Sequence, residues 1–336
     1  MSILLTGGTG YIASHTAVTL LEAGEPVVLF DNLSNSQRDV VARVEQLTGK
    51  VIPFVQGDVR DQALLQRTMQ DHGCHAVVHF AGLKAVGESV AQPIRYYANN
   101  VQGTISLLEA MSGAGVRSLV FSSSATVYGE PEYLPYDEVH PTCAISPYGR
   151  GKLHIEEMLR DVCASDPAWQ VVCLRYFNPV GAHPSGVIGE DPQGIPNNLM
   201  PFVAKVATGE LPAVNVFGTD YPTPDGTGVR DYIHVMDLAE GHLAGIRYLR
   251  KHPGFHPFNL GTGHGYSVLE VIAAFERACE KPLPRKLVGR RDGDLASFYA
   301  DPVKAARELG WRATRSLDAM CETTWKWQSN RVGRQG

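Results

Sequence analysis

Short apolar segments alternate with longer amphipathic ones through the first half of this sequence. The apolar segments are 2–6 (SILLT), 26–30 (PVVLF), 51–55 (VIPFV), 75–81 (HAVVHFA) and 117–123 (RSLVFSS). They are rich in Val, Ile, Leu and Phe without alternation, which predicts parallel strands covered on both faces. Helical periodicity is expected at 11–23, 36–48, 61–72 and 91–111. Such a series predicts an α/β fold, a doubly wound parallel sheet with helices on both faces.

The segment TGGTGYIA, residues 6–13, joins the first expected strand to the first helix. Gly8, Gly10 and Ala13 match the pattern G-x-G-x-x-G/A, in which the small residues allow a tight turn and close packing. Amide groups at the start of the helix suit a pyrophosphate. Asp31 ends the second strand, where a carboxylate accepts hydrogen bonds from ribose hydroxyls and disfavours a 2′-phosphate. The pattern predicts a Rossmann-type domain that binds NAD rather than NADP.

The sequence changes character after Phe177. A helix from Ser146 and a strand at 169–175 continue the series, but 178–232 is rich in Gly, Pro, Asn and Asp. Long loop-rich stretches inside a compact chain are typically functional. Helices are expected again at 235–249, 267–280, 302–309 and 316–329. We therefore expect an NAD-binding domain at 1–177, rejoined by segments at about 230–260, and a smaller C-terminal α/β domain, mainly for substrate, at 178–336.

Tyr148 and Lys152 lie four residues apart and so share one helix face. A phenol has a pKa of about 10, and a positive charge about 4 Å away lowers it enough for the phenol to act as a base near neutral pH. We expect Lys152 and a cationic nicotinamide to supply this charge. Ser124 ends the fifth strand, at the sheet edge where parallel sheets bind ligands. It is expected to relay a proton from a substrate hydroxyl.

Charge and composition argue against several classes of protein. A formal net charge of −5 argues against general binding to nucleic acid or anionic membranes. The N-terminus has no basic region, so no secretion signal is expected, and no apolar run approaches a membrane span. The six cysteines form no C-x-x-C pair, which is typical of reduced thiols in a cytoplasmic protein. His75 and His79 share a strand face without a third ligand, so no metal is expected.

Blocks of sequence spread over the chain resemble the UDP-galactose 4-epimerases, a branch of the extended short-chain dehydrogenase/reductases. They are TGGTGYIA, Asp31, FAGLKAVGES, FSSSATVYGE, SPYGRGK, RYFNPVGAHPSG, IPNNLMP, GTGVRDYIHVMDLA and GDLASFYAD. The resemblance covers roughly residues 2–330. It implies an isomerase of galactose metabolism that interconverts UDP-galactose and UDP-glucose by removing and returning hydride at C4. It also implies a homodimer, with 91–111 and 146–163 as one possible contact, although those segments could equally pack within one chain.

The resemblance assigns roles residue by residue. Tyr148 is the expected base, Lys152 its electrostatic partner and a ribose ligand, and Ser124 the hydroxyl relay. The residues expected to contact NAD are Gly7, Gly10, Tyr11, Ile12, Asp31, Asn32, Leu33, Ser34, Asn35, Ser36, Asp58, Val59, Phe80, Ala81, Gly82, Leu83, Lys84, Asn99, Tyr148, Lys152 and Phe177. The residues expected to contact the UDP-sugar are Ser124, Tyr148, Asn178, Asn198, Leu199, Asn215, Val216, Phe217, Arg230, Arg291, Asp292, Gly293, Asp294 and Phe298.

Some of these positions carry a second interpretation or depart from the family. Asp58 could contact the adenine amino group or cap the next helix. The family often has Y-G-K-S-K where this chain has Tyr148 to Lys152 with Gly151 between them, and that glycine weakens a helix by about 1 kcal/mol relative to alanine. Phe298 stands where the family gates the hexose. A phenyl ring there should exclude an N-acetyl group.

Other functions share parts of this pattern. A sugar-nucleotide dehydratase needs an extra acid and base where Ala125 and Thr126 stand. A UDP-N-acetylglucosamine 4-epimerase is disfavoured only by Phe298. An NAD-dependent dehydrogenase differs by exchanging its cofactor during turnover. A non-catalytic dinucleotide sensor has the fold but no need to keep the serine, tyrosine and lysine together.

Overall fold

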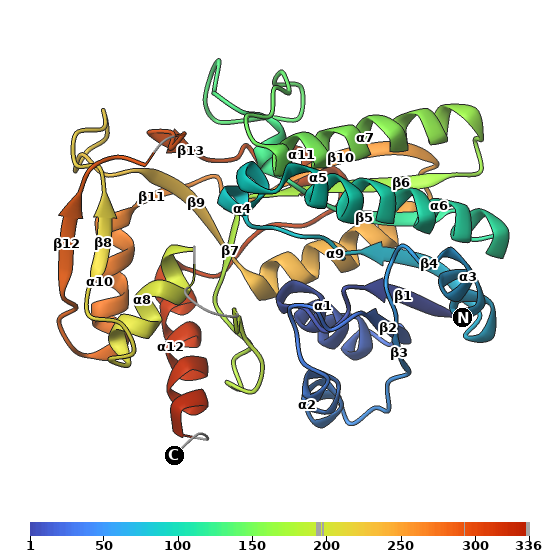
Figure 1. The fold of residues 1–336 in the computed structure, drawn as a ribbon, viewed down its shortest axis with the longest axis horizontal. Helices are drawn as coiled ribbons and strands as arrows, with labels where there is room; N and C mark the ends of the chain where they lie inside the picture. The colour runs from blue at the N-terminus through green and yellow to red at the C-terminus, as the bar shows by residue number, and fades with distance from the viewer. Residues whose placement is uncertain (193–195, 197, 292, 334–336) are drawn as a thin grey trace.

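Seven parallel strands form the central sheet in the order β10-β6-β5-β4-β1-β2-β3 (Figure 1). The computed structural model describes residues 1–192, 196, 198–291 and 293–333. The strands are β1 (Ser2–Thr6), β2 (Val27–Asp31), β3 (Phe54–Gln56), β4 (Cys74–His79), β5 (Ser118–Ser124), β6 (Gln170–Tyr176) and β10 (Gly254–Leu260). The chain reverses its direction of winding between β1 and β4, which places a ligand crevice at their carboxyl ends. The predicted doubly wound α/β fold is confirmed.

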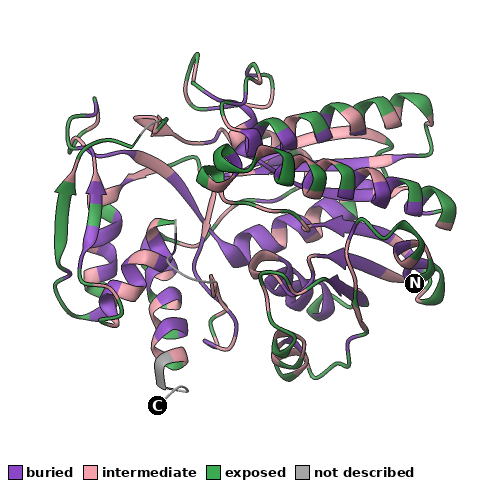
Figure 2. Cartoon of the chain, viewed as in Figure 1, coloured by how far each residue is buried: buried purple, intermediate pink, exposed green. Residues whose placement is uncertain are grey.

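Each strand of this sheet is covered on both faces, which explains why its apolar residues do not alternate with polar ones. Ile3 and Leu5 pack into one core with α1 (Tyr11–Glu22), α2 (Asp39–Thr48) and α9 (Val235–Leu249). Leu4 faces the opposite core with α3 (Gln62–Asp71), α6 (Gln102–Ala114) and α7 (Pro147–Ser165). Figure 2 shows these strands as buried.

The predicted helix at 91–111 is largely confirmed: the chain is helical from Pro93 to Ala114, with one π-helical turn inside it and a break before it at Gln92. The structure has α4 (Val86–Ala91), α5 (Pro93–Tyr96), a π-helical turn η1 (Tyr97–Val101) and then α6. Gln92 leaves the helical conformation with φ −133° and ψ 56°. The residue before a proline is disfavoured in the helical region, and Pro93 cannot donate to the preceding turn. Helical periodicity alone does not reveal this interruption.

The second lobe is built from short strands and three longer helices (Figure 1). A small sheet has β9 (Val229–His234) between β11 (Gly265–Ser267) and β13 (Ser297–Phe298), with β7 (Asn178–Val180) also paired to β9. A separate pair joins β8 (Val214–Phe217) and β12 (Arg285–Val288). The short α11 (Val303–Glu308) lies against β10 of the central sheet, with Ala305 in the first core. The helices of the second lobe are α8 (Leu199–Ala207), α10 (Val268–Cys279) and α12 (Leu317–Gly333). Their apolar faces form a core of their own.

All six cysteines are free, and four of them are buried. Among the described residues, no helix combines the length and the apolar character needed to cross a bilayer.

Candidate active site

The start of α7 positions the tyrosine and the lysine. Ser146 caps the helix, because its Oγ accepts from the Gly149 amide at 3.1 Å, and Pro147 occupies the first turn. A Cβ at Gly149 would lie 2.8 Å from the Thr126 carbonyl oxygen, so glycine lets the helix start approach that segment. A Cβ at Gly151 would meet nothing closer than 4.0 Å. Gly151, which departs from the common family pattern, is therefore not required by packing.

Ser124, Tyr148 and Lys152 come together at the carboxyl end of β5. Each is at most 8% exposed. The Ser124 hydroxyl lies close enough to the Tyr148 phenol to favour its ionised form. Thr126 in turn donates from Oγ1 to Ser124 Oγ at 3.0 Å. These hydroxyls lie beside the phenol, where a proton relay needs them.

Lys152 is buried beneath the same site. Its Nζ donates to the Ser122 carbonyl oxygen at 2.6 Å. It lies 4.7 Å from the centre of the Phe121 ring and 5.9 Å from the centre of the Tyr148 ring. Burial lowers the pKa of Lys152 to about 8, while the nearby Glu156 carboxylate opposes that decrease.

Lys152 alone does not lower the pKa of Tyr148 as predicted. Burial raises the pKa of this phenol well above its ordinary value, and the Ser124 hydroxyl only partly offsets the increase. The physical reason is that a buried phenolate loses its hydration, while the nearest ammonium is directed to the Ser122 carbonyl.

The glycine loop fits a dinucleotide. Gly7 has φ +66°, and a Cβ there would lie 2.8 Å from the Ala81 amide nitrogen, so only glycine suits the turn. Gly10 precedes α1, whose first amides have no side-chain cap among the described residues. Asp31 is buried and accepts from the Thr9 amide at 3.1 Å and the Leu33 amide at 2.8 Å. The positive start of α1 and a fixed carboxylate therefore both adjoin the glycine loop.

Asp58 lies beside this loop but does not cap a helix. It accepts from Asn32 Nδ2 at 3.2 Å and from Arg60 Nε at 2.8 Å, and Arg60 holds the pKa of this carboxyl well below its usual range. The cap of α3 is Asp61, whose carboxylate accepts from the Leu64 amide at 3.0 Å. The capping interpretation of Asp58 is therefore wrong. Of the other positions expected to contact NAD, two begin α1 and the rest lie in the segments after β2 and β3; they are Tyr11 and Ile12, and Ser34, Asn35, Ser36 and Val59.

The segment 80–84 is held by an asparagine that sequence reasoning missed. Asn100 is buried in η1; its Oδ1 accepts from the Leu83 amide at 2.8 Å and from Asn99 Nδ2 at 3.0 Å. Its Nδ2 donates to the Leu83 carbonyl at 2.9 Å. Lys84 continues the segment and pairs with Glu190 at 2.9 Å. The only signal in the sequence was the pair of adjacent asparagines in an otherwise helical stretch.

In the second lobe, two arginines converge on one carboxylate. Arg291 pairs with Asp294 at 2.9 Å, and Arg230 Nη2 lies 3.8 Å from the same side chain. The Arg291 guanidinium also lies 4.7 Å from the centre of the Phe217 ring. Asp294 thus aligns forked cationic donors of the kind that bind a diphosphate.

The other residues expected to contact the UDP-sugar differ in whether their side chain or only their backbone is available to a ligand. Asn178 Nδ2 donates to the Asp231 carbonyl at 3.0 Å. Asn198 is exposed and precedes α8, which begins at Leu199. The Val216 side chain lies in the core of the lobe, so only its backbone is available to a ligand, whereas Asn215 on the same strand is exposed. Gly293 has φ +78°. Asp292 lies outside the described residues.

Phe298 of the second lobe packs against Phe177, which directly follows β6 of the central sheet. Its ring lies 5.1 Å from that of Phe177 and 4.8 Å from that of Tyr136, measured between ring centres. Phe177 and Tyr136 belong to a small apolar cluster with Ala125, which follows Ser124. Tyr136 is fully buried and was missed, because no motif marks the loop that carries it.

Known proteins similar to this chain identify its family. A sequence profile of the NAD dependent epimerase/dehydratase family matches residues 3–261. The chain belongs to the NAD dependent epimerase/dehydratase family. This family member is 59% identical over 330 residues to a UDP-glucose 4-epimerase of Yersinia pestis, and the alignment covers 98% of each chain. The resemblance predicted from the motifs is confirmed.

Solved structures agree with the placement in the NAD dependent epimerase/dehydratase family. The fold matches a UDP-glucose 4-epimerase from Stenotrophomonas maltophila with a TM-score of 0.98 and 51% identity over all of both chains. That enzyme was crystallised with NAD and formylated UDP-arabinopyranose. A second match, to the enzyme of Bifidobacterium longum in complex with NAD+ and UDP, has a TM-score of 0.95 and 54% identity over 99% of each chain.

Proposed function

We propose that the chain is an NAD-dependent UDP-glucose 4-epimerase, an isomerase of galactose metabolism that interconverts UDP-galactose and UDP-glucose. The observation that carries this proposal is the buried Ser124–Tyr148 pair beside Lys152, at the sheet edge next to a dinucleotide loop. Chains that share more than half of this sequence are UDP-glucose 4-epimerases.

Binding of the cofactor follows from the glycine loop. Gly7, Gly10 and the first amides of α1 hold the pyrophosphate, and Asp31 accepts from the adenosine ribose. NAD bound there supplies a reversible hydride acceptor for C4 of the sugar. The segment 80–84 and Phe177 line the nicotinamide end.

The buried hydroxyls of Tyr148 and Ser124 carry out proton transfer at the sugar. Tyr148 removes the proton of the 4-hydroxyl, and Ser124 relays it across the short gap between sugar and phenol. Lys152 keeps positive charge beside the phenolate and bonds the nicotinamide ribose. Inversion at C4 would come from return of the hydride to the opposite face of the 4-keto carbon, while Tyr148 gives the proton back to the 4-oxygen, so the reaction has no net oxidation or reduction.

The anchored diphosphate lets the hexose turn over without leaving. Arg230 and Arg291 hold the phosphates, and Asn178, Asn198 and Leu199 contact the rest of the UDP-sugar. Phe298 limits the space beside the hexose, so the substrates are the unmodified UDP-hexoses rather than N-acetylated ones. In this proposal residues 1–177 with 230–260 bind NAD, and 178–336 mainly bind the UDP-sugar.

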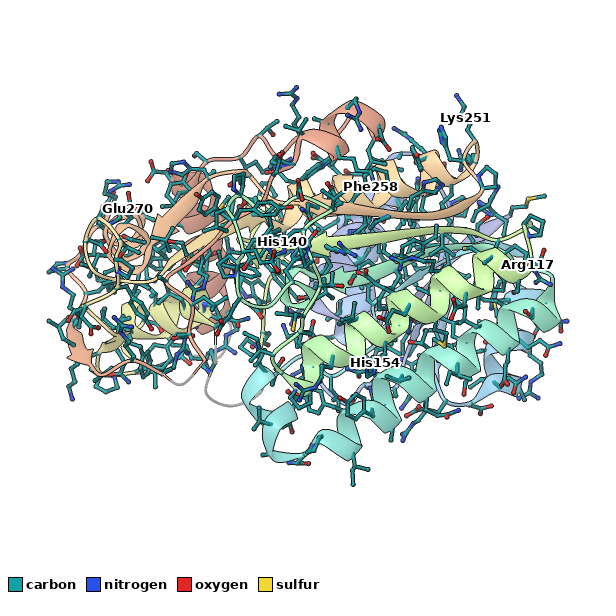
Figure 3. The ribbon with its side chains drawn as sticks, turned by 90° about the horizontal axis from the view of Figure 1, so that it is seen from above. Arg117, His140, His154, Lys251, Phe258 and Glu270 are labelled. Atoms are coloured by element: carbon teal, nitrogen blue, oxygen red, sulfur yellow. The ribbon has the colours of Figure 1, made fainter. Side chains whose placement is uncertain are left out.

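We also propose a cytoplasmic homodimer. Three apolar side chains stand exposed on adjoining helices α4 and α5: Val86 at 46%, Val90 at 64% and Ile94 at 83%. They adjoin α7, whose outer side carries His154 (Figure 3), which stacks on Tyr97. A contiguous apolar patch of this kind favours association with a second copy. Ile94→Asp should convert the dimer to a monomer in light scattering; a wild-type monomer would contradict the proposal.

The function is tested by incubating purified protein with UDP-galactose and no added NAD. We expect UDP-glucose to form without accumulation of NADH, because the hydride returns to the same sugar. A requirement for added NAD with net NADH formation would indicate a dehydrogenase. Loss of water from the sugar would indicate a dehydratase, and no turnover with bound NAD would indicate a sensor.

A further inference from the structure

A buried ion pair lies directly behind the catalytic residues and has no part in the proton transfer described above. Arg175 Nη2 lies 2.6 Å from Glu156 Oε2, and Arg175 Nε lies 3.1 Å from both carboxylate oxygens. The side chains are 3% and 1% exposed. Burial of two charges is costly and is a weak source of stability, so a pair in this position calls for another role.

The pair connects the three elements that carry the site. Glu156 is one turn beyond Lys152 on the same face of α7. Its Oε1 accepts from Ser123 Oγ at 2.5 Å, and Ser123 precedes the catalytic serine on β5. Ser123 is paired in register with Arg175 on β6. The carboxylate therefore fixes α7 against the same strand whose Ser122 carbonyl receives the Lys152 ammonium.

Glu156 is also the carboxylate that acts on the Lys152 ammonium. The other groups around Lys152 and Tyr148 are held neutral by burial: the pKa of His79 on β4 is lowered to about 3, and that of Cys173 on β6 is raised well above its ordinary value. The pKa values of the nearby phenols are raised as well. These phenols are Tyr96 on α5, Tyr148 on α7 and Tyr176 on β6.

We propose that Glu156, held by Arg175, is a positioning residue that keeps Lys152 charged and directed to the Ser122 carbonyl during turnover. A buried ammonium with one neutral acceptor loses its proton readily, and a fixed carboxylate one turn away opposes that loss. Arg175 prevents the carboxylate itself from taking up a proton or turning toward Lys152, because its forked donors occupy both oxygens. The proposal rests on the proposed function only in assuming that turnover needs a charged Lys152.

The test measures the pKa of Lys152 directly in Glu156→Gln. Holoenzyme labelled with ¹³C-lysine is titrated by NMR, and the Lys152 signal is assigned from its loss in Lys152→Arg. We expect the pKa to fall by about one to two units, as for a unit charge one helical turn away at an effective dielectric near 20. The alkaline limb of the rate with UDP-galactose should move to lower pH by the same amount. Glu157→Gln, on the exposed side of the same helix, should leave both unchanged.

The outcomes separate positioning from simple stabilisation. If Glu156→Gln lowers the melting temperature but leaves the Lys152 pKa unchanged, the proposal is overturned. If that variant does not fold, Lys152 is titrated in Arg175→Gln and in Arg175→Gln combined with Glu156→Gln; the double variant should have the lower Lys152 pKa, and equal values overturn the proposal. The titration does not depend on turnover, so a wild-type protein inactive toward UDP-galactose would contradict the proposed function and leave the Glu156–Lys152 coupling measurable.

Discussion

The Lys152 ammonium lies 5.9 Å from the centre of the Tyr148 ring and donates to the Ser122 carbonyl instead of the phenol. The spacing of four residues places both side chains on one face of α7, but it does not make them partners. The group that favours ionisation of the phenol is the hydroxyl of Ser124, on the neighbouring strand. Tyr148 therefore combines a relay from one side with a charge held at a distance on the other.

Tyr148→Phe should lower the rate with UDP-galactose by about 10²- to 10⁴-fold, the range expected for loss of a general base. The phenyl ring keeps the packing, so NAD content and melting temperature should stay near wild type. Tyr176→Phe is the matched control, because it removes a nearby buried phenol that bonds Ser122 Oγ at 3.0 Å. Equal losses in the two variants would contradict the role of Tyr148.

Gly7→Ala should destabilise the protein more than Gly24→Ala. Both glycines have positive φ, which costs an L-residue about 1–2 kcal/mol. At Gly24 a Cβ would meet nothing within 4 Å, whereas at Gly7 it would press on the backbone of Ala81. Urea unfolding and the NAD content of the purified variants test this difference. Similar stability and similar NAD content would show that the loop at Gly7 adapts.

Acid should destabilise the fold steeply below about pH 6. Burial lowers the pKa values of His15, His79 and His234 to about 3 and that of His242 to about 4. The unfolded chain binds these protons near pH 6.5, so stability falls with decreasing pH, by about 1.4 kcal/mol per pH unit for each histidine. Urea unfolding between pH 7 and 5 measures the slope.

A single variant tests the histidine assignment. His242→Asn should reduce the slope by about one proton, while His252→Asn, at an exposed position, should leave it unchanged. An identical slope in wild type and His242→Asn would show that His242 does not contribute.

Phe298→Ala should admit UDP-N-acetylglucosamine. The phenyl ring packs against Phe177 and Tyr136, and its removal opens space beside the cluster that follows Ser124. We expect turnover of the N-acetylated substrate to rise at least about tenfold relative to wild type, the size of effect that a group in an apolar pocket produces. Rates with UDP-galactose on the same variant serve as the control. No gain with the N-acetylated sugar would place the gate elsewhere.

The sequence predicted those parts of the fold and site that depend on local pattern. Continuous apolar runs identified six of the seven strands of the central sheet but not β10, and the helix predicted from Ser146 is α7. The helix predicted at 91–111 began too early, because the break at Gln92 depends on backbone sterics before Pro93 rather than on periodicity.

The contacts that the sequence did not predict depend on how strands, helices and lobes are aligned in the folded chain. The Glu156–Arg175 pair exists because β5 and β6 align Ser123 with Arg175. Asn100 reaches Leu83 only because η1 turns it toward that segment. Tyr136 reaches Phe298 across the two lobes. None of these contacts has a spacing that could be recognised in the sequence.

The edge strand β10 enters the central sheet only after the chain has built β8 and β9 of the second lobe. A fragment that stopped at Phe177 would leave β6, seven residues long, as a bare edge with unpaired backbone groups. Such edges recruit strands from other molecules and aggregate. The two lobes therefore cannot be exchanged between enzymes as cassettes at one junction: a chimera with a new sugar-binding lobe has to splice the chain on both sides of α9 and β10.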